Sequence, residues 1–338
     1  MLKDFCNFVA QNVTHTQTMT SVSDIRASLG EPLERVNTLI SESLHSANPL
    51  MSNVIESYLK HKGKQLRPMM VLLTARMLGE INDRAIAGAA SIEILHNASL
   101  IHDDVVDNSD LRHGQPTINA ILDTQIAVLV GDYFVSTSLR LAMQTRSMSV
   151  VETIASLGRL LSLGEMDQIY NARYHTLSEE AYYEVISHKT ASLFVSCVEM
   201  GCYCCGVTEG PRFEALREYA RIFGLCFQIK DDIFDYFSDP AVGKPTGNDL
   251  REGKVTLPLL HVLAKSEEMR GLVEKGVLTD EEIAELIEFA KANGGIEYAE
   301  ATLERLHREA AEALSVFPDT EGRQDLLTLL SYIIKRDY

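Results

Sequence analysis

One acidic motif occurs twice in this sequence, and no other feature limits the possible folds as much. Asp103–Asp107 reads DDVVD and Asp231–Asp235 reads DDIFD, each preceded by apolar residues in a segment with helical spacing. Positions i and i+4 share one face of a helix, so the outer carboxylates of each motif point in the same direction. Such carboxylates repel each other unless they are protonated or bind cations. Because Mg²⁺ is usually held by one or two carboxylates together with phosphate oxygens, two opposed faces predict a site for a diphosphate-bearing ligand.

Composition and charge exclude several classes of partner. The net charge of −17 argues against a nucleic acid partner and against electrostatic docking to anionic lipid. The six cysteines lack the paired spacing of a metal site, so we expect buried small hydrophobic side chains in a reducing cytosol. We find no secretory signal and no apolar run long enough to span a membrane, which predicts a cytoplasmic protein with no transmembrane segment.

The rest of the sequence reads as one helix after another, with Ser178 and Thr279 as predicted N-caps and no convincing alternating strand. Residues 1–22 are polar and aperiodic, so we expect a loose N-terminal extension there. No linker separates the two halves, so residues 23–338 are predicted to form one all-α domain, a single-domain helical bundle. The predicted helices are 24–46, 49–62, 68–79, 82–107, 117–144, 149–173, 179–206, 211–237, 250–275, 280–293, 295–316 and 321–336.

Basic and polar residues near the acidic motifs complete a candidate binding site. Lys64 and Arg67 precede a helix that starts at Pro68, where backbone N–H groups and two cations favour a second diphosphate. Lys189 lies in the middle of an apolar helix, where an unpaired lysine is costly. The other candidates close to the motifs in sequence are His96, Arg112, Thr190, Gln228, Lys244 and Lys254.

These motifs, taken in order, resemble those of the trans-isoprenyl diphosphate synthase (polyprenyl synthetase) family. The resemblance covers roughly residues 30–338 and is to the long-chain members, the octaprenyl or heptaprenyl diphosphate synthases. The matching pieces are GKxxRP at 63–68, HxxSLIHDDxxD at 96–107, RxGxPT at 112–117, KT at 189–190, FQxxDDxxD at 227–235, GK at 243–244 and GKxTLP at 253–258. The resemblance implies an all-helical bundle of the isoprenoid synthase type around a deep central cavity, a homodimer, and about three Mg²⁺ ions in each active site.

The resemblance also implies a role for each candidate residue. The Mg²⁺ ligands would be Asp103, Asp107 and Asp231, supported by Asp104 and Asp235, with Asp232 completing the second catalytic cluster. The allylic diphosphate would be held by Arg112, Lys189 and Lys254, with Lys244 in the neighbouring loop. Isopentenyl diphosphate would be held by Lys64, Arg67 and His96. Thr190 and Gln228 would lie beside the developing carbocation. The implied reaction is the Mg²⁺-dependent head-to-tail condensation of isopentenyl diphosphate onto geranyl or farnesyl diphosphate.

The length of the product is predicted from the residues one turn before the first motif. Ala98 and Ser99 are small, whereas aromatic residues at these places form a floor in short-chain members of the family. Each helical turn rises about 5.4 Å, which is similar to one isoprene unit, so we expect a product longer than geranylgeranyl diphosphate. The next possible stops are Leu95, Ile94 and Ser91 on the same helix and Tyr133 or Phe134 on the facing one.

Three other functions are compatible with parts of this sequence. A class I terpene cyclase shares the fold and the first motif, but typically replaces the second motif with an Asn/Asp-Ser/Thr-Glu triad and needs no isopentenyl site. A non-catalytic partner subunit of a synthase generally loses one or both acidic clusters, and both are intact here. A purely structural helical protein would explain neither cluster.

The sequence departs from the family at His113, where a second arginine usually helps to bind isopentenyl diphosphate. A neutral imidazole cannot replace a bidentate guanidinium, so we predict weak binding that improves below about pH 6.5, where histidine protonates. His113→Arg should therefore lower the KM for isopentenyl diphosphate near neutral pH, as measured by steady-state kinetics. An unchanged or raised KM would contradict this prediction.

Overall fold

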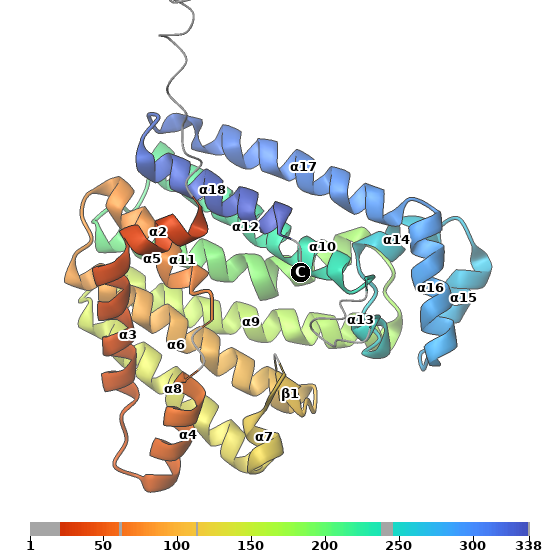
Figure 1. Cartoon of the computed structure of the whole chain (residues 1–338), viewed down its shortest axis with the longest axis horizontal. Coiled ribbons are helices and arrows are strands. Elements are labelled where there is room, and N and C mark those ends of the chain that lie inside the picture. The colour runs from red at the N-terminus through yellow and green to blue at the C-terminus, as the bar shows by residue number, and fades with distance from the viewer. Residues whose placement is uncertain (1–20, 61–62, 113, 238–245, 337–338) are drawn as a thin grey trace, which may run out of the picture.

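The computed structural model describes residues 21–60, 63–112, 114–237 and 246–336, and nearly all of them that lie in regular structure are helical (Figure 1). The first helices are α2 (Val22–Ser28), α3 (Gly30–Leu44), α4 (Pro49–Leu59), α5 (Leu66–Leu78), α6 (Asp83–Val106), α7 (Ile118–Ile121), α8 (Thr124–Gln144) and α9 (Met148–Tyr174). The remainder are α10 (Glu179–Ile186), the π-helix η1 (Ser187–Ala191), α11 (Ser192–Cys204), α12 (Pro211–Phe234), α13 (Asn248–Arg251), α14 (Leu257–Leu263), α15 (Glu267–Glu274), α16 (Asp280–Ala292), α17 (Gly295–Ala313), the 3₁₀ helix η2 (Leu314–Val316) and α18 (Glu321–Lys335).

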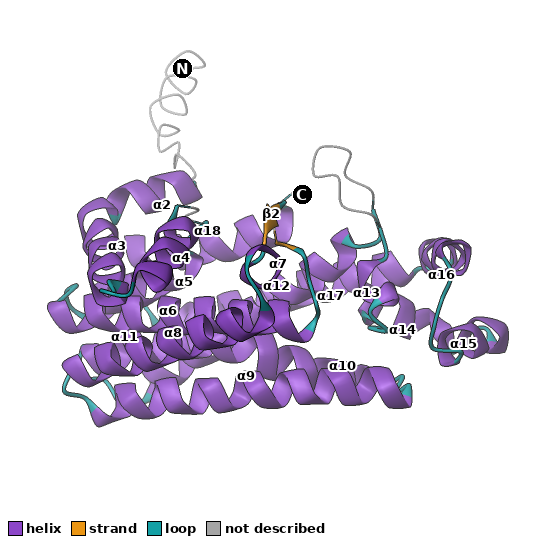
Figure 2. Ribbon diagram, turned by 90° about the horizontal axis from the view of Figure 1, so that it is seen from below, coloured by secondary structure: helices purple, strands orange, loops and turns teal. Residues whose placement is uncertain are grey.

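Helices α5, α6, α11 and α12 form the centre of the bundle, where α11 packs against the other three and α5 packs against α6. They are apolar on most sides, as expected for helices surrounded by others, and Met69 to Leu73 on α5 are fully buried. Helices α17 and α18 cover one edge of the molecule, while α15 and α16 lie at the end farthest from α3 (Figure 1). Helices α9 and α10 lie on the side away from the short β-hairpin (Figure 2). The all-α prediction is therefore confirmed.

Local sequence signals account for several of the helix ends. The Ser178 side chain accepts the backbone N–H of Ala181 at the start of α10, and Thr279 forms a capping box with Glu282 at the start of α16. Both predicted N-caps are confirmed. Of the predicted extension at residues 1–22, only Ser21 and Val22 are among the described residues, and Ser21 already caps α2.

Some predicted helices are interrupted, and each interruption has a local cause. The predicted helix 117–144 is broken after α7, because the Asp123 side chain accepts the N–H of Ile126 and starts a new helix. The predicted helix 250–275 is three short helices, since Gly253 adopts a positive φ of 74° and Ser266 caps α15. The prediction of no strands was wrong for β1 (Leu111–Arg112) and β2 (Gln115–Pro116), an antiparallel hairpin too short to show alternation.

Among the described residues, one helix, α8, is long and apolar enough to cross a membrane by length and composition. In this structure α8 packs along α6, and Phe134 and Leu141 on it are fully buried. The hydroxyl groups of Ser91 on α6 and Ser138 on α8 each donate to the other residue's backbone carbonyl, both at 2.8 Å. The hydropathy of α8 is thus that of a helix packed within the bundle, with exposed apolar side chains such as Leu129 and Met143 on its outer side.

The contact between α12 and η1 is close enough to require glycine. A Cβ atom on Gly224 would lie 2.4 Å from the Cα of Ala191, which is a backbone atom that cannot move aside. We predict that Gly224→Ala lowers the free energy of unfolding by about 1–3 kcal/mol, the usual cost of overpacking. Urea denaturation would measure this loss. The control is Gly271→Ala in the exposed α15, where nothing lies within 4 Å of the added Cβ. That control should be neutral or stabilising by up to about 1 kcal/mol, and equal effects at both sites would contradict the prediction.

Candidate active site

The two acidic motifs occupy the C-terminal ends of two central helices. Asp107 is the C-cap residue of α6 and Asp235 is the C-cap residue of α12. The C-terminal end of a helix carries partial negative charge, so carboxylates are unfavourable there and cations are favoured. Both motifs therefore concentrate negative charge where the backbone already supplies it, and a bound cation would relieve the repulsion.

The three carboxylates of the first motif have different surroundings. Burial raises the pKa of Asp103 to about 6, against the opposing attraction of Lys189. Asp104 is buried and accepts hydrogen bonds from the Arg112 guanidinium, which reaches it at 2.7 Å from strand β1. Asp107 is exposed. The hairpin that follows the motif thus serves to hold Arg112, a predicted diphosphate ligand, beside the carboxylates.

Each carboxylate of the second motif also has a protein partner. Asp231 is paired with Arg336 at the end of α18, whose guanidinium also lies over the Phe227 and Phe234 rings. Asp235 accepts the backbone N–H groups of Asn248 and Asp249, both at 3.0 Å, at the start of α13.

Asp232, in contrast, is buried. It accepts from the Tyr182 hydroxyl at 2.6 Å and from the Gln228 amide at 2.8 Å. Burial raises the pKa of Asp232 to about 7, and these two hydrogen bonds oppose the rise.

The predicted lysines lie between the motifs and are held by acidic neighbours. Lys189 pairs with Glu165 on α9. Lys254 pairs with Glu252. Burial lowers the pKa of Lys254, but the Glu252 hydrogen bond and the charges of Glu252, Asp107 and Asp249 outweigh burial and raise it. The charge of Asp107, in the first motif, therefore acts on Lys254 although Lys254 follows the second motif in sequence. Lys254 also lines the same cavity as Asp232, so it lies between the two motifs.

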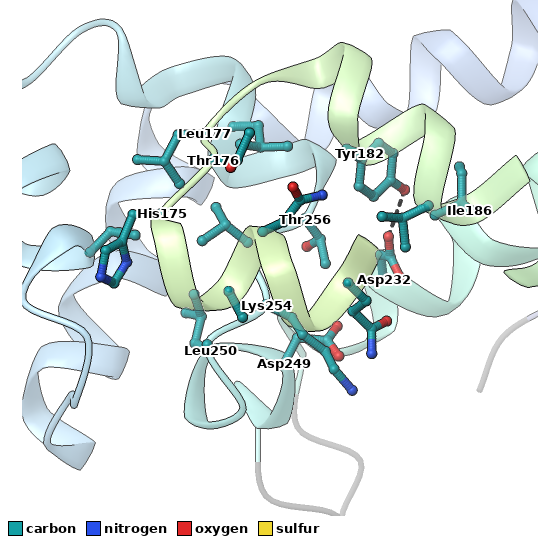
Figure 3. A pocket seen from close by; sticks show the side chains of 18 of the residues that line it. His175, Thr176, Leu177, Tyr182, Ile186, Asp232, Asp249, Leu250, Lys254 and Thr256 are labelled. Carbon is teal, nitrogen blue, oxygen red and sulfur yellow. Dashed lines mark hydrogen bonds between the residues drawn. The ribbon is translucent and has the colours of Figure 1, made fainter. Parts of the chain in front are cut away.

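A cavity of about 220 Å³ lies beside the second motif. Its polar end is lined by Lys189, Thr190, Gln228, Asp232, Asp249 and Lys254. Its other end is formed by residues such as His175, Leu177 and Leu278. Figure 3 shows Tyr182 at the wall with its hydroxyl directed at Asp232, and Lys254 close to Asp249. Five of the predicted site residues therefore meet around one cavity.

The second predicted anion site lies at the N-terminal end of α5. Lys64 lies 5.4 Å from the centre of the Tyr332 ring, and the Arg67 guanidinium lies 5.3 Å from that of Phe194. Burial lowers the pKa of Arg67, and the charge of Glu93 is the largest effect that opposes this. Burial is the main cause that lowers the pKa of His96 well below its usual value, and the charges of Arg67 and Arg112 lower it further. This imidazole is therefore neutral. Arg67 and His96 are therefore close enough for the charge of Arg67 to act on the imidazole.

Some predicted residues lie outside the described part of the chain, and some important residues were missed. His113 and Lys244 are not among the described residues. The sequence reading missed Tyr182, Glu165 and Arg336. Tyr182 lies two helical turns before Lys189, and that spacing could have suggested it. Arg336 is distant in sequence from both motifs, so no local pattern pointed to it.

The described residues suit Mg²⁺, although no group of three or more His, Cys, Asp or Glu side chains among them forms a complete metal cage. Oxygen donors are what Mg²⁺ requires, and it commonly takes only one or two carboxylates and completes its shell with phosphate and water. A carboxylate such as Asp103, whose raised pKa reflects costly burial of its charge, would be stabilised by a cation. A diphosphate would therefore be needed to complete the metal site.

An all-helical bundle with two carboxylate motifs at helix ends, and lysines beside them, suits an enzyme that binds a metal-complexed diphosphate. The family model described as "Polyprenyl synthetase" matches residues 48–291. The chain belongs to the polyprenyl synthetase family, and the predictions of this family, of its fold and of a prenyltransferase are confirmed.

An octaprenyl diphosphate synthase from Haemophilus influenzae is 33% identical over 328 residues, which cover 95% of this chain and 99% of the relative. The structure of a polyprenyl synthase from Caulobacter crescentus, complexed with calcium and isoprenyl diphosphate, is similar with a TM-score of 0.87 and 32% identity, over 94% of this chain and 99% of that one. Dependence on a divalent metal is thus supported at the level of the family.

Two further matches bear on assembly and product. A Bacillus subtilis relative, 31% identical over 92% of this chain and 89% of its own length, is named heptaprenyl diphosphate synthase component 2. The structure of a geranylgeranyl pyrophosphate synthase from Bacteroides thetaiotaomicron has a TM-score of 0.80 and 39% identity over 92% of this chain and 98% of that one. The proteins similar to this chain are therefore named for products of different lengths, and one of them is named as a component of an enzyme.

The raised pKa of Asp103 predicts a stability effect with a definite sign. A native-state pKa of about 6 against an ordinary value of 3.8 means that the native state binds more protons between these values. Stability is therefore lost as pH rises from about 4 to 6, by up to about 3 kcal/mol. Without divalent ions, Asp103→Asn should unfold at a higher temperature than the wild type at pH 7.5 but not near pH 4. A lower unfolding temperature at pH 7.5 would contradict the prediction.

Proposed function

We propose that this protein is an all-trans polyprenyl diphosphate synthase that adds isopentenyl diphosphate to an allylic diphosphate, geranyl or farnesyl diphosphate, and makes a product longer than geranylgeranyl diphosphate. The observation that carries the proposal is the pair of carboxylate motifs at the ends of α6 and α12, with Lys189 and Lys254 placed beside them. The name of the Haemophilus relative agrees with a long product.

The first diphosphate binds between the two motifs. Asp103, Asp107 and Asp231 would hold about three Mg²⁺ ions together with the diphosphate, and bound Mg²⁺ would supply positive charge to balance that of the departing diphosphate. Lys189, Lys254 and Arg112 contribute fixed positive charges, and each is held by a carboxylate: Glu165, Glu252 and Asp104. Preorganised charges of this kind are the main source of catalysis when a bond breaks to form ions.

Isopentenyl diphosphate binds at the start of α5, on Lys64, Arg67 and the neutral His96. The allylic C–O bond breaks, and its electron pair leaves with the diphosphate. The double bond of isopentenyl diphosphate then attacks the allylic carbon, and a proton leaves for an oxygen of the departed diphosphate. The hydroxyl of Thr190 and the amide of Gln228 border the polar end of the cavity where the cation forms. The surrounding apolar walls exclude water that would otherwise quench the cation.

The small residues before the first motif leave room for a long tail. Ala98 is fully buried, and Ser99 is half-buried with its hydroxyl donating to the His96 carbonyl at 2.8 Å. The Tyr133 hydroxyl bonds to the His45 carbonyl between α3 and α4, so Tyr133 points away from the bundle centre. Phe134 is fully buried against Tyr58, with ring centres 5.7 Å apart. Of these two aromatic residues, Phe134 is the better candidate for the end of the tail site.

The enzyme acts as a homodimer in the cytoplasm, with α8 and α9 at the interface. The outer side of these two helices carries large apolar side chains that are more than half exposed, namely Leu129, Met143, Met148, Met166, Tyr170 and Tyr174. Patches of this kind usually mark protein contacts. A two-subunit enzyme with a different partner is the second candidate, because the Bacillus relative is named as a component.

Product analysis tests the proposed function. The purified protein would be incubated with Mg²⁺, isopentenyl diphosphate and farnesyl diphosphate, and the dephosphorylated prenols would be sized. We expect a ladder that ends well beyond geranylgeraniol. If the chain alone consumed no isopentenyl diphosphate, the result would contradict the proposal. It would favour a terpene cyclase or a subunit that needs a partner.

Ser99→Phe should shorten the products toward geranylgeraniol while leaving isopentenyl diphosphate consumption measurable, because an aromatic ring one turn before Asp103 would obstruct the tail. The same prenol analysis would measure the change. The control is Ser315→Phe at an exposed position of η2, which should leave the ladder unchanged. An unshortened ladder in Ser99→Phe would show that the tail does not run along this face of α6.

A further inference from the structure

We infer that Tyr182 is a positioning residue for the reacting centre, which orients the oxygen atoms of Gln228 and Thr190 through Asp232. The inference rests on the proposed function, because it concerns the place where the allylic cation would form. Tyr182 lies at the wall of the cavity, and we infer that it acts through Asp232, the residue that its hydroxyl holds.

A continuous chain of hydrogen bonds connects Tyr182 to the cavity. The Tyr182 hydroxyl donates to Oδ2 of Asp232 at 2.6 Å, as Figure 3 shows. Oδ1 of Asp232 accepts from Nε2 of Gln228 at 2.8 Å. Oε1 of Gln228 in turn accepts from the Thr190 hydroxyl at 2.7 Å. The chain joins α10, α12 and η1, three elements that meet at one end of the cavity.

The direction of these bonds decides which atoms face the cavity. Asp232 receives a donor on each oxygen, so the Gln228 amide must turn its NH₂ group toward Asp232 and its oxygen toward Thr190. Thr190 then gives its only hydroxyl hydrogen to Gln228, and the remaining lone pairs of Thr190 are free to face a positive charge. If the amide were reversed, Thr190 would have to accept from it and would present hydrogen to the cation instead.

The structure fixes Tyr182 from outside the site. Tyr182 is 8% exposed and its ring packs edge-on against Tyr183, with centres 5.4 Å apart. The first turn of α10 is held by the hydroxyl of Tyr298 on α17, which donates to Glu179 at 2.9 Å. Helix α10 then continues into η1, a π-helical turn of the kind often found at functional sites, which carries Lys189 and Thr190. Loss of the Tyr182 hydroxyl would leave a buried Asp232 oxygen without this donor and free the carboxylate to rotate.

The test compares Tyr182→Phe with Tyr183→Phe, each measured with Mg²⁺, isopentenyl diphosphate and farnesyl diphosphate. We expect Tyr182→Phe to lower kcat about tenfold, with KM for both substrates within about twofold and an unfolding temperature close to that of Tyr183→Phe. Tyr183 is the control because it lies on the same helix and makes no hydrogen bond in this chain of contacts. An equal kcat in the two variants, or a change in KM alone, would overturn the inference.

A double-mutant cycle separates positioning from general structural damage. If Tyr182 acts through Thr190, the double variant Tyr182→Phe/Thr190→Val should lose clearly less activity than the product of the two single losses. Multiplicative losses would overturn the inference. Should Tyr182→Phe fold poorly, Asp232→Asn replaces it in the same cycle, because an amide at this position cannot accept from both neighbours. Wild-type protein that fails to consume isopentenyl diphosphate would instead refute the proposed function, so the two failures are distinguishable.

Discussion

Repulsion among carboxylates at the C-terminal ends of α6 and α12 is the interaction on which the rest of this structure depends. The helix ends add partial negative charge to the same place, so the fold would be strained there without compensating groups. The structure supplies them one by one: Arg112 for Asp104, Arg336 for Asp231, and the start of α13 for Asp235. In the first motif, Asp103 and Asp107 are not paired with a cation at ion-pair distance among the described residues. They are two of the three carboxylates that we propose to hold the metal ions.

The helical fold and the centre of the site could be predicted because their signals are local. A repeated DDxxD motif, an apolar approach and capping residues such as Ser178 and Thr279 all act within a few residues of one another. Helix continuity was less predictable. Asp123 ends one helix by capping the next, and a capping aspartate looks the same in sequence as any exposed acidic residue. The hairpin at β1 and β2 was missed because two-residue strands carry no periodic pattern.

The parts of the site that could not be predicted depend on contacts between distant segments. Arg336 reaches Asp231 across more than a hundred residues of sequence, and no spacing rule connects them. Tyr182 reads as an ordinary buried aromatic residue of α10 until the fold brings it to Asp232. Sequence patterns therefore located the groups that meet the substrate, while the residues that hold those groups in place became visible only in three dimensions.

Asp235 has a consequence for the behaviour of the neighbouring segment. Its two oxygens accept the backbone N–H groups of Asn248 and Asp249, and each oxygen keeps a second lone pair that a metal ion could use. Asp235 therefore connects the start of α13 directly to the second motif, and a cation bound at the motif would act on residues 248–251 through this carboxylate. Amide hydrogen exchange of Asn248 and Asp249 would then report on the binding of a cation at Asp235, independently of any measurement of turnover.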